Sequence, residues 1–207
     1  MNYFPLLLNI EYKTAVVVGG GHVARQKVEA LLPAKANIIV VSPEVTKELQ
    51  AYIDQNLITW RQKAFEPADL DDAALVFAVT DKTEVNDAVE EATQHWQLLS
   101  RADALGRVDF INPAVVRRGE FLLTVSTSGN SPKLTRQVKA ELAEAYGEHY
   151  GPYVEFLGHA RKEILATFSG EEKRERLAEL LNPQFLQWAQ QGQMEKCKEW
   201  LKKRLGE

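Results

Sequence analysis

Three consecutive glycines and the residues after them form the stretch whose spacing most clearly indicates chemistry. Residues 17–24 read Val-Val-Gly-Gly-Gly-His-Val-Ala and contain a Gly-x-Gly-x-x-Ala pattern. In this pattern the first glycine permits a tight turn, the second lets the backbone approach a pyrophosphate, and the alanine lets a helix pack closely on a strand. The N–H groups at the start of that helix then face the phosphates. The predicted cofactor-binding residues here are Gly19, Gly21, His22, Val23 and Ala24.

A predicted strand and a predicted helix flank these glycines. Residues 15–18 are small and β-branched apolar residues, typical of a strand buried on both faces, and residues 25–32 have helical spacing. A second apolar strand is predicted at residues 37–41, and Glu44 lies 20 residues after Ala24, near the expected place of an acid that binds a ribose. We therefore predict a dinucleotide site. The alternative is a glycine turn that binds nothing.

Strands and helices alternate through the first half of the chain, as in a doubly wound parallel sheet. Ligands of such a sheet sit outside the carboxyl ends of its strands. Four segments follow predicted strand ends and should share one crevice: residues 19–22, 42–44, 80–81 and 100–103. The cofactor-binding residues predicted on the second and third of these segments are Ser42, Pro43, Glu44 and Thr80.

The pattern changes after residue 110, which predicts more than one domain. The overall prediction is an α/β fold. It has a Rossmann-like domain with a doubly wound parallel sheet at residues 1–112, a small α+β domain at 113–146 and a C-terminal helical domain at 147–207. Two local details belong to it. The apolar residues 3–8 are expected to pack on the sheet, and residues 113–116 are expected to form a helical turn.

Charge and cysteine content argue against several classes of protein. The net charge of −4 gives no basic surface for nucleic acid, and Cys197 is the only cysteine, so an intrachain disulfide is excluded and a reducing compartment is favoured. We find no signal peptide and no apolar stretch long enough to span a membrane. A cytoplasmic protein that acts away from membranes is therefore expected.

Two further stretches hold candidate chemistry beside a plain structural interpretation. The first, residues 100–109, carries Asp103 at the predicted crevice, or is only a solvated loop. The second, residues 126–131, is rich in hydroxyls and precedes a predicted helix, so it suits an anionic ligand or is only a helix cap. The basic residues near it indicate a polyanionic small ligand or a solvated surface: Arg117, Arg118, Lys133, Arg136 and Lys139. The histidines and Cys197 have no metal-ligand spacing, so no metal site is predicted, and Cys197 is expected in a helical core.

Three blocks of this sequence resemble one known family. They are residues 17–27, 109–119 and 125–134, which include Asp-Phe-Ile-Asn-Pro-Ala-Val-Val-Arg-Arg-Gly and Val-Ser-Thr-Ser-Gly-Asn-Ser-Pro-Lys-Leu. The blocks are similar to the dehydrogenase part of siroheme synthase, the precorrin-2 dehydrogenase family, and the resemblance covers roughly residues 1–145. Three blocks in the same order are far more specific than a glycine pattern alone.

The resemblance implies an enzyme of siroheme biosynthesis that oxidises precorrin-2 to sirohydrochlorin with NAD. It implies a homodimer in which the domain at residues 113–146 supplies the dimer contact. Matched to the family's motif, Asp103 would be the catalytic general base, and Ser126 and Thr127 would bind substrate. Arg117 and Lys133 are added as substrate-binding residues, because a tetrapyrrole with acetate and propionate arms is a polyanion.

Alternatives remain open from the sequence. Within the enzyme class, a bifunctional dehydrogenase and sirohydrochlorin ferrochelatase is the second hypothesis. From another class, a dinucleotide-sensing regulatory module would need the glycine loop and Glu44 but not Asp103. Glu44, if it binds the ribose hydroxyls, would repel a 2′-phosphate and so favour NAD over NADP.

Overall fold

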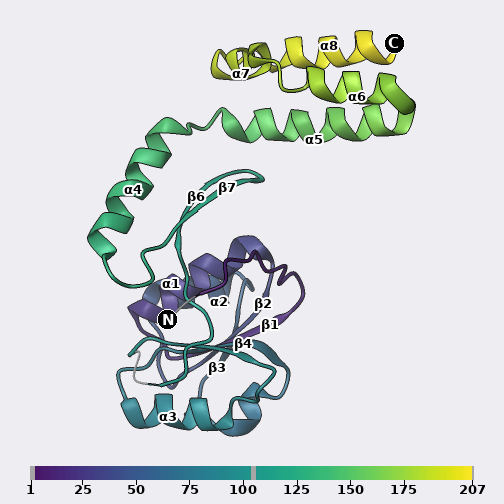
Figure 1. The fold of residues 1–207 in the computed structure, drawn as a ribbon. Helices are drawn as coiled ribbons and strands as arrows, with labels where there is room; N and C mark the ends of the chain where they lie inside the picture. Colours follow the sequence, from purple (N-terminus) through teal and green to yellow (C-terminus); the bar gives the residue numbers. More distant parts are fainter. Residues whose placement is uncertain (1–2, 104–105, 207) are drawn as a thin grey trace. The chain divides into compact units, whose positions relative to one another are not determined.

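The computed structural model of the chain describes residues 3–103 and 106–206 and is drawn in Figure 1. The chain divides into two compact units, Met1–Asn112 and Pro113–Glu207, here called the first unit and the second unit. The first holds the glycine loop and Asp103, and the second holds the hydroxyl-rich turn and the basic residues around it.

A five-stranded parallel sheet forms the centre of the first unit. Its strands lie in the order β3-β2-β1-β4-β5. They are β1 (Thr14–Val18), β2 (Asn37–Val41), β3 (Thr59–Arg61), β4 (Ala73–Ala78) and β5 (Leu98–Arg101). In this doubly wound order the chain direction across the sheet reverses between β1 and β4, and the ligand crevice is expected there.

Helices cover both faces of that sheet, as Figure 1 shows. They are α1 (His22–Leu31), η1 (Leu32–Ala34), α2 (Lys47–Asp54), η2 (Pro67–Leu70) and α3 (Thr83–Ala92). On one face Val28 of α1 and Leu49 of α2 share a core with Val17, and on the other Val89 of α3 shares a core with Val16. Because both faces are covered, every side chain of β1 after Thr14 is buried. The predicted doubly wound α/β fold is confirmed.

A β-hairpin and one helix begin the second unit. The strands β6 (Ala114–Arg118) and β7 (Phe121–Val125) pair antiparallel, and Gly119 adopts a φ of +58° in their tight connection. Helix α4 (Pro132–Ala145) starts with proline at its first position, and the Ser131 hydroxyl accepts a hydrogen bond from the Leu134 N–H. At the other end of α4, Arg118 donates to the carbonyls of Ala143 and Tyr146 at 3.1 Å each. The arginine thus satisfies carbonyls that a helix end leaves open.

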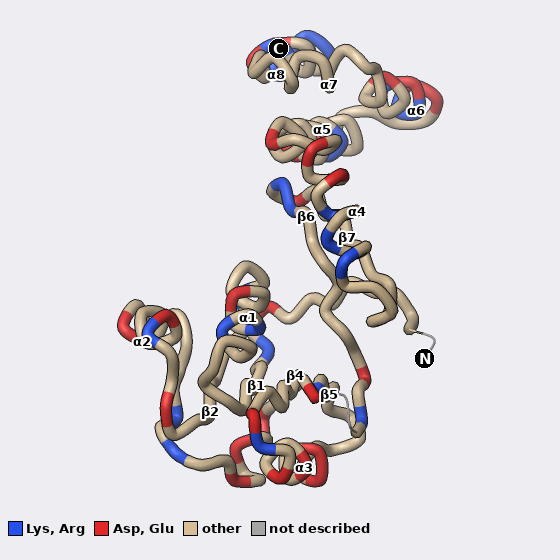
Figure 2. Tube along the Cα trace, turned by 90° about the vertical axis from the view of Figure 1, so that its left-hand side faces the viewer, with Lys and Arg blue, Asp and Glu red and all other residues tan. Residues whose placement is uncertain are grey.

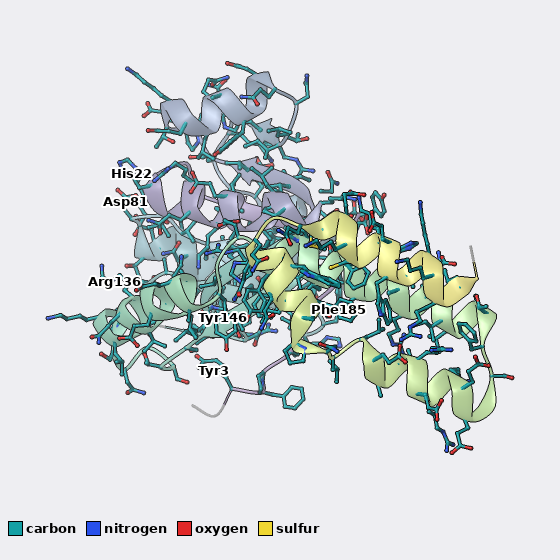
Figure 3. The ribbon with its side chains drawn as sticks, turned by 90° about the horizontal axis from the view of Figure 1, so that it is seen from above. Tyr3, His22, Asp81, Arg136, Tyr146 and Phe185 are labelled. Atoms are coloured by element: carbon teal, nitrogen blue, oxygen red, sulfur yellow. The ribbon has the colours of Figure 1, made fainter. Side chains whose placement is uncertain are left out.

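Four further helices complete the second unit: α5 (Tyr150–Thr167), α6 (Gly170–Glu179), α7 (Pro183–Gln190) and α8 (Met194–Leu205). Their core includes Phe156, Ile164 and Phe185, the last of which is labelled in Figure 3. Cys197 is fully buried in the same core, as predicted, and burial raises the pKa of its thiol. Within the described part of the chain, no helix combines the length and the apolar character that crossing a membrane requires.

Two local predictions are wrong. The expected helical turn at residues 113–116 is instead part of β6, where β-branched Val116 pairs opposite Leu123 of β7. The expected packing of residues 3–8 on the sheet is also absent among the described residues, because Phe4 is 81% and Leu7 76% exposed. The physical reason is that α1 and α2 already cover that face, and only Ile10 of the N-terminal segment joins its core.

Candidate active site

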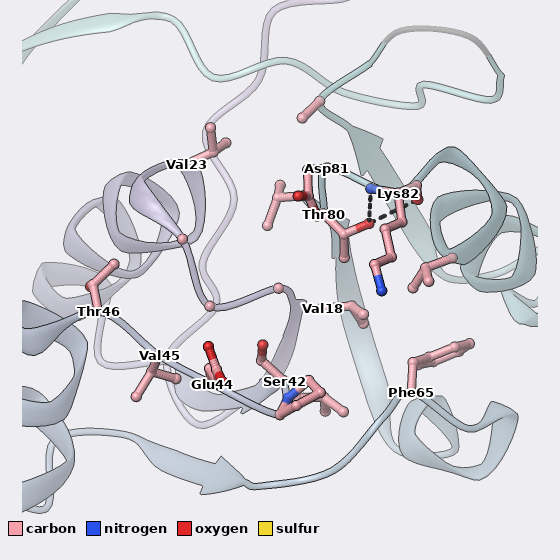
Figure 4. Close-up of a pocket in the computed structure, with 18 of the residues that line it drawn as sticks. Val18, Val23, Ser42, Glu44, Val45, Thr46, Phe65, Thr80, Asp81 and Lys82 are labelled. Carbon is pink, nitrogen blue, oxygen red and sulfur yellow. Dashed lines mark hydrogen bonds between the residues drawn. The ribbon is translucent and has the colours of Figure 1, made fainter.

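A cavity of about 680 Å³ opens in the first unit at the carboxyl ends of its strands. Its size lies within the range of about 300–1,000 Å³ that ligand pockets occupy. The glycine loop and residues 42–46 form one part of the wall, and residues 80–82 face them (Figure 4). Ala102 also lines the cavity. Every predicted cofactor residue except Ala24 lines it: Gly19, Gly21, His22, Val23, Ser42, Pro43, Glu44 and Thr80.

The glycine loop packs so closely that side chains are excluded at its first two positions. Gly19 has a φ of +126°, and a Cβ there would lie 2.8 Å from the Val79 carbonyl oxygen. A Cβ on Gly20 would collide with the Glu44 carbonyl oxygen, because the segment after β2 crosses directly over the loop. The Thr46 N–H donates to the Gly20 carbonyl at 2.9 Å and holds that crossing in place.

Gly21, in contrast, faces open space. A Cβ built there meets no described heavy atom within 4 Å. Gly21 is also the N-cap of α1, and in this described helix no side chain caps the first turn and no acidic residue lies in it. Open space above unpaired N–H groups at a helix start suits phosphate oxygens. Ala24 is fully buried against the sheet, where its small size lets α1 approach.

The facing segment after β2 is fixed through its backbone. The Trp60 indole N–H donates to the Ser42 carbonyl at 2.9 Å, and the Ser42 N–H donates to the Arg61 carbonyl at 3.3 Å. The Glu44 side chain is exposed and lies beside the glycine loop in Figure 4. A carboxylate at this place can accept hydrogen bonds from ribose hydroxyls. These residues therefore fit a dinucleotide, with the pyrophosphate over Gly21 and a ribose beside Glu44.

Asp103 follows the cavity residue Ala102 and is held by a buried arginine. Arg101 Nε donates to Oδ1 of Asp103 at 2.9 Å, and Nη2 donates to Oδ2 at 2.8 Å. The Arg101 side chain is only 2% exposed. Its Nη1 donates to Asp87 at 2.9 Å and to Glu90 at 2.6 Å, both on α3, whose acidic residues are visible in Figure 2. We call these four residues the Arg101 cluster.

The hydrogen bonds of the Arg101 cluster shift the pKa values of Arg101 and Glu90. The pKa of Arg101 is raised, first of all by its hydrogen bonds to Asp103. The pKa of Glu90 is lowered, first by the hydrogen bond from Arg101 and then by the N–H of Arg107. A carboxylate paired with arginine stays in its charged form, which is the form a general base needs.

Asn86 connects Asp103 to the cavity wall. It lies on α3 and is 1% exposed. Its Nδ2 donates to Oδ2 of Asp103 at 3.0 Å and to the Thr80 carbonyl at 3.2 Å. Its Oδ1 accepts from the Thr80 N–H at 3.2 Å and lies 2.9 Å from the Thr80 hydroxyl. One amide group therefore joins the loop after β4 to the loop after β5.

Hydrogen bonds to neighbouring elements also fix residues 106–109. Arg107 donates to Asp109 at 2.9 Å, and the Asp109 carboxylate accepts the Leu99 N–H at 2.9 Å. The Arg107 N–H donates to Glu90 at 2.9 Å. These contacts favour an ordered, positioned segment over the solvated loop that was the alternative from the sequence.

The predicted substrate residues lie in the second unit, in and around the turn before α4. The Ser126 hydroxyl accepts the Ser128 N–H at 3.0 Å, and the Thr127 hydroxyl accepts the Ser131 N–H at 3.0 Å. Arg117 and Lys133 are exposed. Thr127 therefore shapes the turn, whereas the two cations face solvent. Arg118, which the sequence placed among the same basic residues, holds the end of α4 instead.

The sequence interpretation missed three residues of the first unit: Gly20, Asn86 and Arg101. Gly20 had a signal in the sequence. The pattern requires glycine only at positions 19 and 21, so a third glycine between them indicates that a side chain is excluded there as well. Asn86 carried another, because it lies three residues before the buried Val89 on the core side of a predicted helix. Arg101 belonged to the candidate stretch 100–109, but no signal indicated its burial, because charged residues are normally exposed. Over the described residues, no group of three or more His, Cys, Asp or Glu is placed to hold a metal ion.

Comparison with known families identifies the first unit. Residues 6–114, more than half of the chain, match the family described as "Putative NAD(P)-binding". The chain belongs to this NAD(P)-binding family. Residues 123–145 match the family described as "Sirohaem biosynthesis protein central". The prediction of an NAD(P)-binding unit is thereby confirmed.

Individual relatives agree with these two matches. The chain is 33% identical over 211 residues to a siroheme synthase of Nitrosospira multiformis, which covers 99% of this chain and 45% of the relative. It is 35% identical over 175 residues to a siroheme synthase of Nitrosococcus oceani, covering 84% of this chain and 37% of the relative. The chain thus spans less than half the length of these curated relatives.

A solved structure matches nearly the whole length of this chain. It is SirC, a precorrin-2 dehydrogenase, with a TM-score of 0.79 and 27% identity. The match covers 95% of this chain and 100% of the other. The resemblance predicted from three sequence blocks, to siroheme synthase and precorrin-2 dehydrogenase, is therefore confirmed.

Replacing Gly21 by alanine should weaken NAD⁺ binding without destabilising the protein. The new methyl group meets no described atom, and the Gly21 φ of −88° suits alanine, but the methyl group takes the space above the helix start. We expect an affinity loss of at least about tenfold, or 1.4 kcal/mol, by isothermal titration. The melting temperature should stay within about 2 °C of wild type. Gly158→Ala, at another open glycine, is the matched control and should leave binding unchanged. Wild-type affinity in Gly21→Ala would contradict the assigned pyrophosphate position.

Replacing Arg101 by methionine should lower the free energy of unfolding by about 3 kcal/mol at neutral pH, since three carboxylates lose their shared cation. The loss should shrink on acidification. The pKa of Glu90 is lowered from its ordinary 4.5, so its stabilising contribution exists above pH 4.5 and disappears as the pH falls through the lowered value. Urea unfolding between pH 7 and pH 3 measures both effects.

The matched control for that experiment is Lys35→Met. Lys35 forms an exposed pair with Glu11 at 3.4 Å, and removing such a pair costs less than about 1 kcal/mol. If Arg101→Met changed stability no more than this control at any pH, the ion pairs of the Arg101 cluster would not stabilise the first unit.

Proposed function

We propose that this chain is an NAD-dependent precorrin-2 dehydrogenase that forms sirohydrochlorin in siroheme biosynthesis. The observation that carries the proposal is a carboxylate held next to a dinucleotide cavity. Ala102 lines the cavity, and the adjacent Asp103 is fixed by Arg101 from one side and Asn86 from the other. A sensing module would have no use for such an arrangement. The similarity to SirC over 95% of this chain supports the same activity.

The oxidation removes two hydrogens from the tetrapyrrole ring, one as hydride and one as a proton. NAD⁺, when bound, supplies the hydride acceptor. Asp103 accepts the proton, and it is paired with Arg101, a contact that favours the charged form of a carboxylate. The glycine loop and the start of α1 hold and orient the dinucleotide, and Glu44 accepts from a ribose. The exposed Glu44 carboxylate disfavours a 2′-phosphate, so we assign NAD rather than NADP.

Substrate binding is assigned to residues of the second unit. Arg117 and Lys133 are exposed cations that suit the acetate and propionate arms of precorrin-2. Ser126 and Thr127 add hydroxyls in the turn at the start of α4, and Ser126 is the more exposed of the two. We propose that these four residues bind the carboxylate arms of the substrate.

We also propose that residues 113–146 form a dimerisation domain, followed by a helical domain at residues 147–207, and that the enzyme is a cytoplasmic homodimer. Within one chain, the described 14-residue helix α4 has no buried residue. Leu134 on α4 is 48% exposed, and Val115 on β6 is 38% exposed. The helix and the hairpin contact each other but leave these apolar side chains exposed, so a second copy is the expected cover. The buried free thiol of Cys197 suits the reducing cytoplasm.

The test of the activity is an anaerobic assay of the full chain with enzymatically prepared precorrin-2 and NAD⁺, without metal. NADH and the sirohydrochlorin spectrum report turnover. Asp103→Asn should lower turnover about 100-fold or more, the usual effect of losing a general base. Asp72→Asn, at an exposed acid of the same unit, is the matched control and should turn over normally. NADP⁺ run in parallel should be the poorer cofactor.

Two results would contradict the proposal. Tight NAD binding without any turnover would favour the sensing module. Full activity in Asp103→Asn would show that Asp103 is not the general base. Adding Fe²⁺ or Co²⁺ to the sirohydrochlorin formed then tests the second hypothesis, the ferrochelatase.

Replacing Leu134 by glutamate should shift the protein from dimer to monomer. A charge in an apolar contact made by both copies is introduced twice, and each loses its hydration. Analytical ultracentrifugation should show a dissociation constant raised at least about tenfold. Leu181→Glu is the matched control, since Leu181 is 78% exposed outside this domain. An unchanged dimer in Leu134→Glu would exclude this face of α4 as the contact.

A further inference from the structure

We propose that Asn86 is a positioning residue for the reaction: its amide group fixes the Asp103 carboxylate relative to the cavity and keeps it free of a proton. This inference rests on the proposed function, in which Asp103 is the base. It adds a residue on α3 that touches neither substrate nor cofactor in that proposal and acts only through Asp103 and Thr80.

The backbone of Thr80 decides which way the Asn86 amide points. An N–H can only donate and a carbonyl can only accept. The Thr80 N–H therefore faces Oδ1 of Asn86, and the Thr80 carbonyl faces Nδ2. With the amide oriented in this way, the second hydrogen of Nδ2 is directed at Oδ2 of Asp103 at 3.0 Å. The orientation is thus set by main-chain groups and does not depend on Asp103.

This arrangement links the base to the wall of the cofactor cavity. Thr80 lines the cavity, and its hydroxyl also accepts a hydrogen bond from the Lys82 N–H at 3.2 Å (Figure 4). This bond fixes the turn of the loop after β4. Asn86 is 1% exposed, so water does not compete for its contacts. Any displacement of Asp103 by a hydrogen-bond length would break a buried contact, which is costly.

Asn86 is also the neutral member of a strongly charged surrounding. Arg101 from β5 contacts Asp103 directly, and Asp87 and Glu90 from α3 reach the other side of the same guanidinium. The Arg107 N–H meets Glu90, and Asp81 and Lys82 line the cavity beside Thr80. One arginine already serves three carboxylates here, so a fourth acid next to Asp103 would be poorly compensated.

The substitution Asn86→Asp tests this with almost no change in shape. A carboxylate at position 86 can still accept from the Thr80 N–H, but it opposes the Thr80 carbonyl and the Asp103 carboxylate. Two carboxylates at hydrogen-bond distance share a proton, which raises the pKa of the pair. The proton would then occupy the base at a pH where the wild-type base is free.

The experiment uses the full-length protein in wild-type, Asn86→Asp and Asn37→Asp forms. Asn37 is an exposed asparagine on β2 and controls for the added charge. The Asp103 carboxyl carbon is followed by ¹³C NMR from pH 3 to pH 9, assigned with Asp103→Asn. Turnover is measured over the stable part of that range, and NAD⁺ affinity is measured by titration.

We expect the Asp103 titration midpoint and the acid limb of turnover to move to higher pH together in Asn86→Asp, by at least about one unit. Turnover at neutral pH should fall about tenfold or more and recover as the pH rises. NAD⁺ affinity should change less than about threefold. Asn37→Asp should match wild type in all three measurements. A residue with only a structural role would lower turnover equally at every pH and leave the midpoint in place.

The double variant Asn86→Asp with Asp103→Asn keeps the proposal testable if the single variant folds poorly. It restores the hydrogen bond in reverse, with the amide at position 103 donating to the carboxylate at position 86. We expect folding and NAD⁺ affinity to return while turnover stays absent. If the double variant is no more stable than Asn86→Asp, the contact does not hold the site and the proposal is overturned.

The two proposals fail in different ways. An unshifted Asp103 titration in Asn86→Asp overturns the role of Asn86, whether or not the protein turns over precorrin-2. A shifted titration in a protein whose wild type has no turnover overturns the proposed function alone.

Discussion

A buried guanidinium group is stable only when carboxylates or carbonyls surround it, and the part of the first unit around Asp103 depends on this constraint. Arg101 stands at the end of β5 with 2% of its side chain exposed. It draws Asp87 and Glu90 of α3 toward the sheet from one side and Asp103 from the other. The position of the proposed base is therefore a consequence of how α3 packs. A shift of that helix would reach Asp103 through two routes, the guanidinium and the Asn86 amide.

The other half of the cavity depends on close approach rather than on charge. The segment after β2 crosses the glycine loop so tightly that a single methyl group on Gly20 would collide with it. The Thr46 N–H and the Trp60 indole fix that segment through backbone carbonyls, which leaves the Glu44 side chain exposed for a ligand. Rigid backbone on one wall and a fixed carboxylate near the other suit a reaction in which cofactor and base must meet one substrate atom.

Short-range patterns in the sequence were sufficient to predict the parallel sheet and the glycine loop. The β-branched run of β1 and the glycine spacing are short-range features, and they correctly predicted the sheet and the NAD(P)-binding unit. Arg101 and Asn86 depend on contacts between residues that are 2 to 17 positions apart in sequence and on different elements. The position of Asn86 on the core side of its helix was a weak local signal. Arg101, a charged residue at the end of β5, had no local signal of its burial. The prediction of a helical turn at residues 113–116 was wrong for a related reason. Four residues contain too little periodicity to distinguish a turn of helix from a strand.

The two units differ in how well one chain alone covers their helices and strands. Both faces of the sheet in the first unit are covered by helices of the same chain. In the second unit none of the described residues of α4 is buried, although the helix contacts β6 and β7, and Ser131 and Arg118 hold its two ends. On the proposed function, Lys133 in α4 and Ser126 and Thr127 before it bind the tetrapyrrole, so the substrate residues stand on the element that most needs a partner. Because α4 gains little burial within one chain, dimer assembly and substrate binding would then be coupled through the stability of this one helix.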